Sequence, residues 1–122
     1  MIPNILVTIP TTRLDESIAF YTDVLGFAVE RRLDRPGGVS LVFLVNEGFV
    51  VELVANPNLP AGEVGASAPM LTFQVKSHDE ITTCLAANGI SCPKAMELPG
   101  GISILRFNDP NGVLISFVAG DH

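Results

Sequence analysis

The sequence has 122 residues, of which 48% are hydrophobic and 16% charged, and its net charge is −6. This composition indicates one folded domain and excludes an intrinsically disordered chain, and the acidic balance disfavours nucleic acid as a partner. No apolar run approaches the roughly 18 residues of a membrane span, and the first residues lack a signal-peptide pattern. Cys84 and Cys92 offer no disulfide framework. We therefore expect a cytoplasmic protein without a membrane partner.

The first half of the chain predicts a strand, a helix and three further strands. A β-branched run over 5–9 is typical of a buried strand. Thr11 and Thr12 offer an N-cap for a helix whose apolar residues recur at helical spacing and which ends at Gly26. The following strands are predicted over 27–33, 39–45 and 49–55.

The second half predicts the same order of elements. Segment 57–68 is rich in proline and glycine and is interpreted as a linker. After a strand over 71–75, Ser77 and Glu80 have the spacing of a capping box for a helix that ends near Asn88. The last strands are predicted over 94–98, 102–108 and 113–118.

The two halves also repeat each other in sequence. Pro-Gly-Gly at 36–38 recurs at 99–101, and the strand at 48–55 recurs at 112–119, which are shifts of 63 and 64 residues. Such a period indicates one supersecondary unit used twice. We therefore predict a single α+β domain, 1–122, built from two β-α-β-β-β modules, 1–56 and 69–122, joined by linker 57–68.

Two segments resemble a known family. The helix segment Ser-Ile-Ala-Phe-Tyr-Thr-Asp-Val-Leu-Gly-Phe at 17–27 and the turn Phe-Asn-Asp-Pro-Asn-Gly at 107–112 resemble the glyoxalase/bleomycin resistance/extradiol dioxygenase (vicinal oxygen chelate) superfamily. The resemblance implies two mixed sheets, each curled into a cup around a ligand cavity, and a homodimer. It leaves the activity open, because this scaffold hosts lyases, isomerases, dioxygenases and drug-binding proteins.

The resemblance also implies four metal-ligand positions, two in each module. Alignment on the helix segment and on the repeat places these positions at Leu6, Glu52, Met70 and Ser116. Only Glu52 has ligand chemistry, since leucine has no donor atom and a thioether or a neutral hydroxyl suits hard divalent ions poorly. We therefore expect no metal site and no cofactor.

Glu52 interrupts an apolar strand and is the main candidate site residue. It is either a ligand contact, a general acid/base, or an inherited strand residue without a role. Thr8, Thr72 and Gln74 share the strand parity of Leu6 and Met70, so they either line the same cavity or belong to a solvated face.

Arg106 has two possible placements in its strand. In one hairpin register it lies inside the cup and could pair with Glu52 or bind an acidic ligand. In the other it is a surface arginine, which is the interpretation that we favour. Arg31, Arg32 and Arg35 are interpreted as charges that protect an edge strand rather than as an anion site.

Three functions fit these residues. We favour a metal-free protein that binds a small molecule in the cavity and sequesters an antibiotic or a metabolite. The alternative is an enzyme of the superfamily, such as a lyase, isomerase or dioxygenase, that uses Glu52 as acid/base or metal ligand. A structural or regulatory module with a filled cavity is the third.

Overall fold

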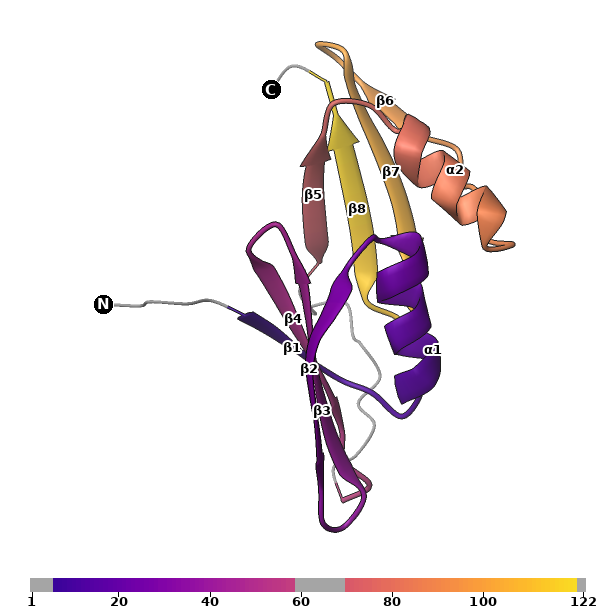
Figure 1. Cartoon of the computed structure of the whole chain (residues 1–122). Coiled ribbons are helices and arrows are strands. Elements are labelled where there is room, and N and C mark those ends of the chain that lie inside the picture. Colours follow the sequence, from indigo (N-terminus) through magenta and orange to yellow (C-terminus); the bar gives the residue numbers. More distant parts are fainter. Residues whose placement is uncertain (1–5, 59–69, 121–122) are drawn as a thin grey trace. The chain divides into compact units, whose positions relative to one another are not determined.

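The computed structural model describes residues 6–58 and 70–120. The chain divides into two compact units, each with one four-stranded sheet and one helical segment (Figure 1). Of the predicted linker 57–68, only residues 57 and 58 belong to the described part, and Ile5 also lies outside it. No helix in the described part is long and apolar enough to cross a membrane.

The first unit contains the elements predicted for the first module. These are β1 (Leu6–Pro10), α1 (Leu14–Ala19), the π-helical turn η1 (Phe20–Val24), β2 (Ala28–Arg35), β3 (Val39–Asn46) and β4 (Phe49–Ala55). The sheet order is β1-β4-β3-β2, with β1 parallel to β4 and the other pairs antiparallel.

The second unit repeats this topology. It contains β5 (Leu71–Val75), α2 (Asp79–Ala87), β6 (Met96–Leu98), β7 (Ile102–Asn108) and β8 (Leu114–Ala119), in the sheet order β5-β8-β7-β6. The parallel pair is again formed by the first and last strands of the unit. The predicted α+β class with two β-α-β-β-β modules and mixed sheets is therefore confirmed, although β6 is shorter than the predicted strand 94–98.

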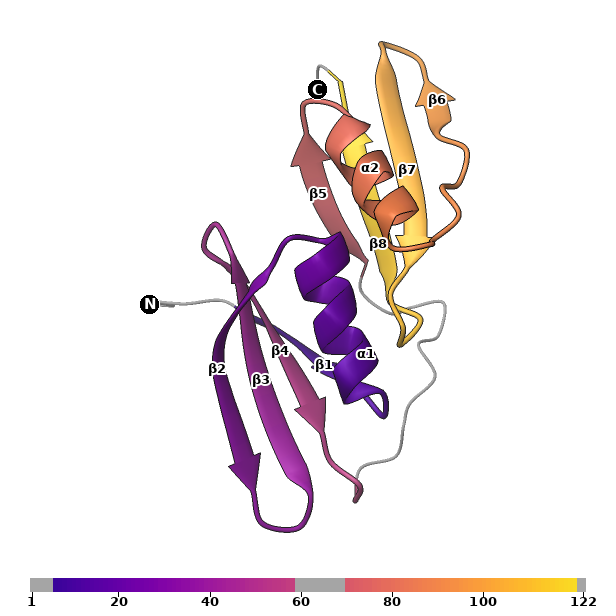
Figure 2. The same ribbon diagram turned by 45° about the vertical axis from the view of Figure 1, so that its right-hand side comes forward.

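Each sheet packs one face against its own helix, which Figures 1 and 2 show from two sides. We call this the proximal face and the opposite one the distal face. In the first unit the proximal face is fully buried at the centre of the sheet, and Tyr21 on the helical segment is 0% exposed as well. Its central residues are Val42, Leu44, Val51 and Leu53. Burial of these side chains accounts for the alternating pattern of β3 and β4.

The proximal face of the second unit is rich in aromatic side chains. Phe117 on β8 stacks on Phe73 of β5 and on Phe107 of β7, with ring centroids 5.2 and 5.8 Å apart. Ile81 and Leu85 of α2 are buried as well. Stacked aromatic pairs add to the free energy of burial, so this face is the apolar core of the unit.

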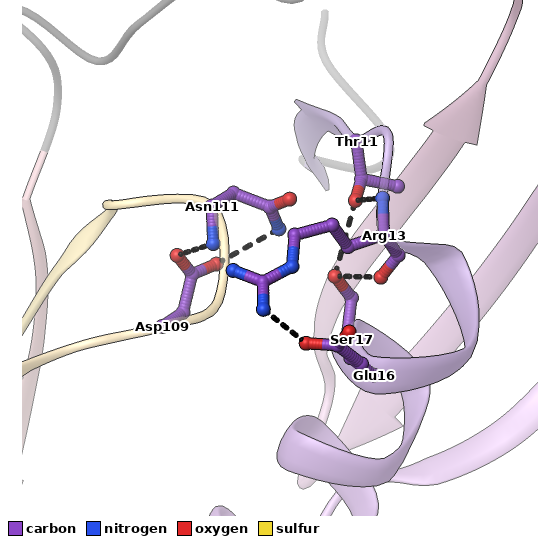
Figure 3. Close-up of polar contacts among 6 residues, drawn as sticks. All are labelled: Thr11, Arg13, Glu16, Ser17, Asp109 and Asn111. Carbon is purple, nitrogen blue, oxygen red and sulfur yellow. Dashed lines mark hydrogen bonds and ion pairs between the residues drawn. The ribbon is translucent and has the colours of Figure 1, made fainter.

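The first helix begins later than the threonine N-cap prediction implied, because its N-cap is Arg13, which makes no side-chain capping bond. Thr11 instead accepts a hydrogen bond from the Arg13 backbone N–H at 2.9 Å, and its hydroxyl lies 3.1 Å from that of Ser17 (Figure 3). Ser17 in turn donates to the Arg13 carbonyl at 2.7 Å. These bonds pair the hydroxyls of Thr11 and Ser17, two polar side chains that are both buried.

The helix also widens where a regular α-helix was expected. Residues Phe20–Val24 form a π-turn, in which the Leu25 N–H donates to the Phe20 carbonyl at 3.2 Å. Phe20, Tyr21 and Val24 are all buried. The wider turn places these apolar side chains toward the sheet, and Gly26 then ends the segment with a φ of 75°.

The predicted capping box of the second helix is wrong. The N-cap is His78, so Ser77 lies one residue too early, and its hydroxyl accepts the Asp79 N–H at 3.3 Å instead. His78 places its Nε2 atom 3.1 Å from the Phe117 carbonyl oxygen. A contact between the helix start and β8 thus replaces the local cap that the sequence suggested.

The turn between β7 and β8 is organised by one buried carboxylate. Asp109 is 5% exposed and accepts hydrogen bonds from the backbone N–H groups of Asn111 and Val113, both at 2.8 Å. The Asn111 side-chain amide donates to its second oxygen at 3.3 Å (Figure 3). These bonds within the Asn-Asp-Pro-Asn-Gly segment give the turn its shape, so Asp109 has a structural role there.

Candidate functional site

The candidate site residues of the first module lie on the distal face of its sheet. Glu52 pairs with Thr8 across the parallel β1–β4 ladder, and Leu6 pairs with Val50 on the same face. The Thr8 hydroxyl donates to Glu52 Oε1 at 2.8 Å. Glu52 is half-buried, and this bond fixes one of its oxygens while the second can accept from a ligand.

The row continues across the sheet from Glu52 to an aromatic ring and a cation. Phe43 of β3 is the antiparallel partner of Glu52, and Arg31 of β2 is the partner of Phe43. Residues opposite each other in a sheet point to the same face. The distal face thus carries a hydroxyl, a carboxylate, an aromatic ring and a guanidinium in consecutive strands.

A β-bulge places Arg31 in this row. The β2–β3 register runs from Val29↔Leu44 directly to Arg31↔Phe43, so β2 advances two residues while β3 advances one. In a regular strand without a bulge, Arg31 would share the face of Val29, two residues earlier, which is the proximal one. Arg31 and Phe43 were not among the residues predicted for the site, because nothing in the sequence marks a bulge at Glu30.

The distal face of the second module carries the equivalent row. Thr72 of β5 pairs with Ser116 of β8, and Ser116 pairs with Arg106 of β7. This is the first of the two registers considered for Arg106: it shares the face of Ser116, whereas Leu105 and Phe107 point to the proximal face. Its side chain is exposed, while Ser116 is 2% exposed.

The remaining predicted residues lie at the margins of this row. Gln74 pairs with Val118, two residues along β5 from Thr72, and is exposed on the same face. Met70 lies just before β5 and outside any strand, with 42% of its surface exposed, and Leu6 at the start of β1 is 44% exposed. Both apolar side chains are too exposed to fill a cavity on the sheet of their own module.

The donor atoms on the two distal faces do not suit a divalent metal ion. Among the strand residues that the structure describes, Glu52 is the only carboxylate that the pairing registers place on a distal face. The second module's distal face offers hydroxyls, the amides of Gln74 and Asn108, and a guanidinium. Within residues 6–58 and 70–120, no three His, Cys, Asp or Glu side chains come together as a metal-binding group. A metal of the kind that the resemblance implied would have one strong protein ligand.

Several known proteins share this architecture. A lactoylglutathione lyase of Salmonella typhimurium is 30% identical over 112 residues, which cover 86% of this chain and 83% of that protein. The solved glyoxylase/bleomycin resistance protein/dioxygenase domain of Frankia sp. EAN1pec superposes with a TM-score of 0.81 at 23% identity and covers 94% of its length and 100% of this chain.

A second solved structure is that of a mutant of the fosfomycin resistance protein FosX of Listeria monocytogenes, in complex with manganese(II) and a dihydroxypropylphosphonic acid. It superposes with a TM-score of 0.76 at 18% identity over 99% of this chain and 95% of its own. Residues 5–117 match the sequence model of the Glyoxalase/Bleomycin resistance protein/Dioxygenase superfamily. The chain therefore belongs to the glyoxalase/bleomycin resistance protein/dioxygenase superfamily.

Proposed function

We propose that this protein binds a small molecule on its distal sheet faces without a metal ion, and that it sequesters an antibiotic or a metabolite. The observation that carries the proposal is the composition of the two rows. Together the two rows contain hydrogen-bond donors and acceptors and an aromatic surface, but only one carboxylate. The rows are Thr8–Glu52–Phe43–Arg31 in the first module and Thr72–Ser116–Arg106 in the second. Such rows suit recognition through hydrogen bonds and apolar contact.

One related protein supports a small antibiotic as the ligand. FosX is a resistance protein that was crystallised with a phosphonic acid, which makes small polar antibiotics reasonable ligands. In the first module, half-buried Glu52 would attract a cationic or hydrogen-bond-donating group of a ligand, and in the second module exposed Arg106 would attract an anionic group.

Thermal-shift measurements in the presence of a chelator test this proposal. The panel contains fosfomycin, other small antibiotics and common metabolites, and we expect at least one compound to raise Tm progressively with its concentration when EDTA is present. A ligand that binds only the folded state stabilises it in proportion to the logarithm of its concentration. Stabilisation that disappears with EDTA would show that binding needs a metal and would contradict the proposal.

An enzyme is the second candidate, because the curated relatives are lactoylglutathione lyases. Glu52 with its Thr8 bond would then be the acid/base. An assay for lactoylglutathione formation, with and without added divalent metal, separates the two functions. Turnover that is abolished in Glu52→Gln would establish the enzyme, whereas ligand-induced stabilisation without turnover favours the binding protein.

We further expect a homodimer, as the family resemblance implies. Apolar side chains at the edges of both sheets support it: Val29 on β2 is 48% exposed, and Met96 and Leu98 on β6 are 49% and 38% exposed. Covering such residues is a common reason for association. Light scattering at micromolar concentration should give about twice the 13.0 kDa of one chain, and a monomer over the whole concentration range would refute the prediction.

A further inference from the structure

We propose that the distal face of the first module selects apolar acids: molecules with an apolar body, an anionic group held by Arg31, and a hydroxyl or amino group directed at Glu52. This inference rests on the proposed binding function and names the class of ligand. It comes from three features of the sheet, which are the bulge in β2, the charges of its arginines and the spacing of the row.

The bulge gives β2 a cationic side on the distal face. Because Arg31 pairs with Phe43, residues two and four positions further along point the same way, and Arg35 therefore joins Arg31 on this face with Leu33 between them. Arg32 pairs with Val42, which is 0% exposed in the proximal core. Arg31 and Arg35 therefore lie on the distal side of β2, whereas Arg32 lies on its proximal side.

The arginines also differ in their partners. Arg32 Nε lies 3.2 Å from Asp34 Oδ1, and the Ser40 hydroxyl donates to the same oxygen at 2.7 Å. These two hydrogen bonds, that of Ser40 foremost, lower the pKa of the Asp34 carboxyl. Arg31 and Arg35, by contrast, form no ion pair within the described residues. The net charge of the chain is −6, so the protein as a whole does not attract anions. Two guanidiniums without an ion pair on one face nevertheless give that face local complementarity to an anion.

The spacing of the row sets the shape of the ligand. Glu52 lies two strands away from Arg31, which is roughly 10 Å, and Phe43 lies between them. Half-buried apolar side chains flank Phe43 along the strands, among them Leu41 and Val50. The Glu52 carboxylate would repel an anion close to it. We therefore expect the anionic group of the ligand to lie at Arg31 on β2 and a hydrogen-bond donor of the ligand to lie at Glu52. A molecule with only one of these two groups would interact with either Arg31 or Glu52, but not with both.

Two fluorescent probes test the selection for an acid. 8-Anilinonaphthalene-1-sulfonate and N-phenyl-1-naphthylamine have the same aromatic frame and the same N–H group, and only the first carries an anionic sulfonate. Binding is measured by titration well below Tm, so that partly unfolded protein does not contribute. We expect the sulfonate to bind wild type about tenfold more tightly than the neutral probe, and raising the salt concentration should reduce this difference.

The variants locate the anionic group. Arg31→Gln should weaken the sulfonate probe about five- to tenfold and leave the neutral probe unchanged, with a smaller loss for Arg35→Gln. Arg32→Gln is the matched control, because it removes the same charge from the other side of the same strand, and it should leave both affinities unchanged. Phe43→Ala should weaken both probes, since it removes the aromatic surface under their common frame.

The outcomes separate this inference from the function on which it rests. Equal loss of the sulfonate probe in Arg31→Gln and Arg32→Gln would overturn the inference, because a general charge effect would then explain the affinity. Saturable binding of both probes that no arginine affects would overturn the inference but leave the binding function in place. If neither probe binds wild type, both proposals fail for this face.

Discussion

Protein purified without chelators and then incubated with zinc, nickel, manganese or iron(II) should retain far less than one ion per chain. The expected result follows from the donor groups on the two distal faces. Glu52 supplies one carboxylate, and its Oε1 atom already accepts the Thr8 hydroxyl, while Leu6 at the position expected of a ligand has no donor atom. Ser116 and Thr72 add neutral hydroxyls, which bind these ions weakly.

Elemental analysis after extensive dialysis gives the number of ions per chain. FosX of Listeria, which was crystallised with manganese(II), is a suitable positive control because it shares the fold and passes through the same procedure. One tightly held ion per chain that is lost in Glu52→Gln would contradict the prediction. An ion that Glu52→Gln retains would contradict it as well, and would point to a site away from both rows.

The fold could be predicted from the sequence because its two halves support each other. The repeat of the Pro-Gly-Gly turn and of the last strand restricts each module to the same element order, and the observed sheets have that order. Element ends were less certain, since they depend on bonds that sequence spacing does not show. Ser77, for example, has capping-box spacing, but His78 occupies the N-cap position and contacts Phe117 instead.

The site could be predicted only in part, for a related reason. Strand parity placed Thr8 on the face of Leu6, because alternation along a strand follows directly from its geometry. It could not show that Thr8 pairs with Glu52 or that Thr72 pairs with Ser116, since these pairs are formed between strands. The faces of Arg31 and Arg106 depend on the register between strands. One register is changed by the bulge at Glu30, and the other depends on how the β7–β8 turn pairs its ends. No local residue pattern determines either.

Glu52→Gln should weaken binding of a hydroxylated or cationic ligand by about 1.5–3 kcal/mol, or about 10- to 150-fold, which is the range for a hydrogen bond to a charged group. The amide has the shape of the carboxylate, and its oxygen can still accept the Thr8 hydroxyl that now lies 2.8 Å from Oε1. The free energy of unfolding should therefore change by about 1 kcal/mol or less. Ligands found by thermal-shift screening are titrated against both proteins by calorimetry.

Glu47→Gln is the matched control for this substitution. Glu47 is an exposed residue of the β3–β4 turn, so its replacement changes the net charge of the protein equally but leaves the distal face intact. If affinity falls in Glu52→Gln and not in Glu47→Gln, the carboxylate on the distal face contacts the ligand. If both variants bind as wild type does, Glu52 is an inherited strand residue and the ligand lies elsewhere. Equal losses in both would mean that long-range attraction by the acidic protein, rather than contact with Glu52, provides the affinity.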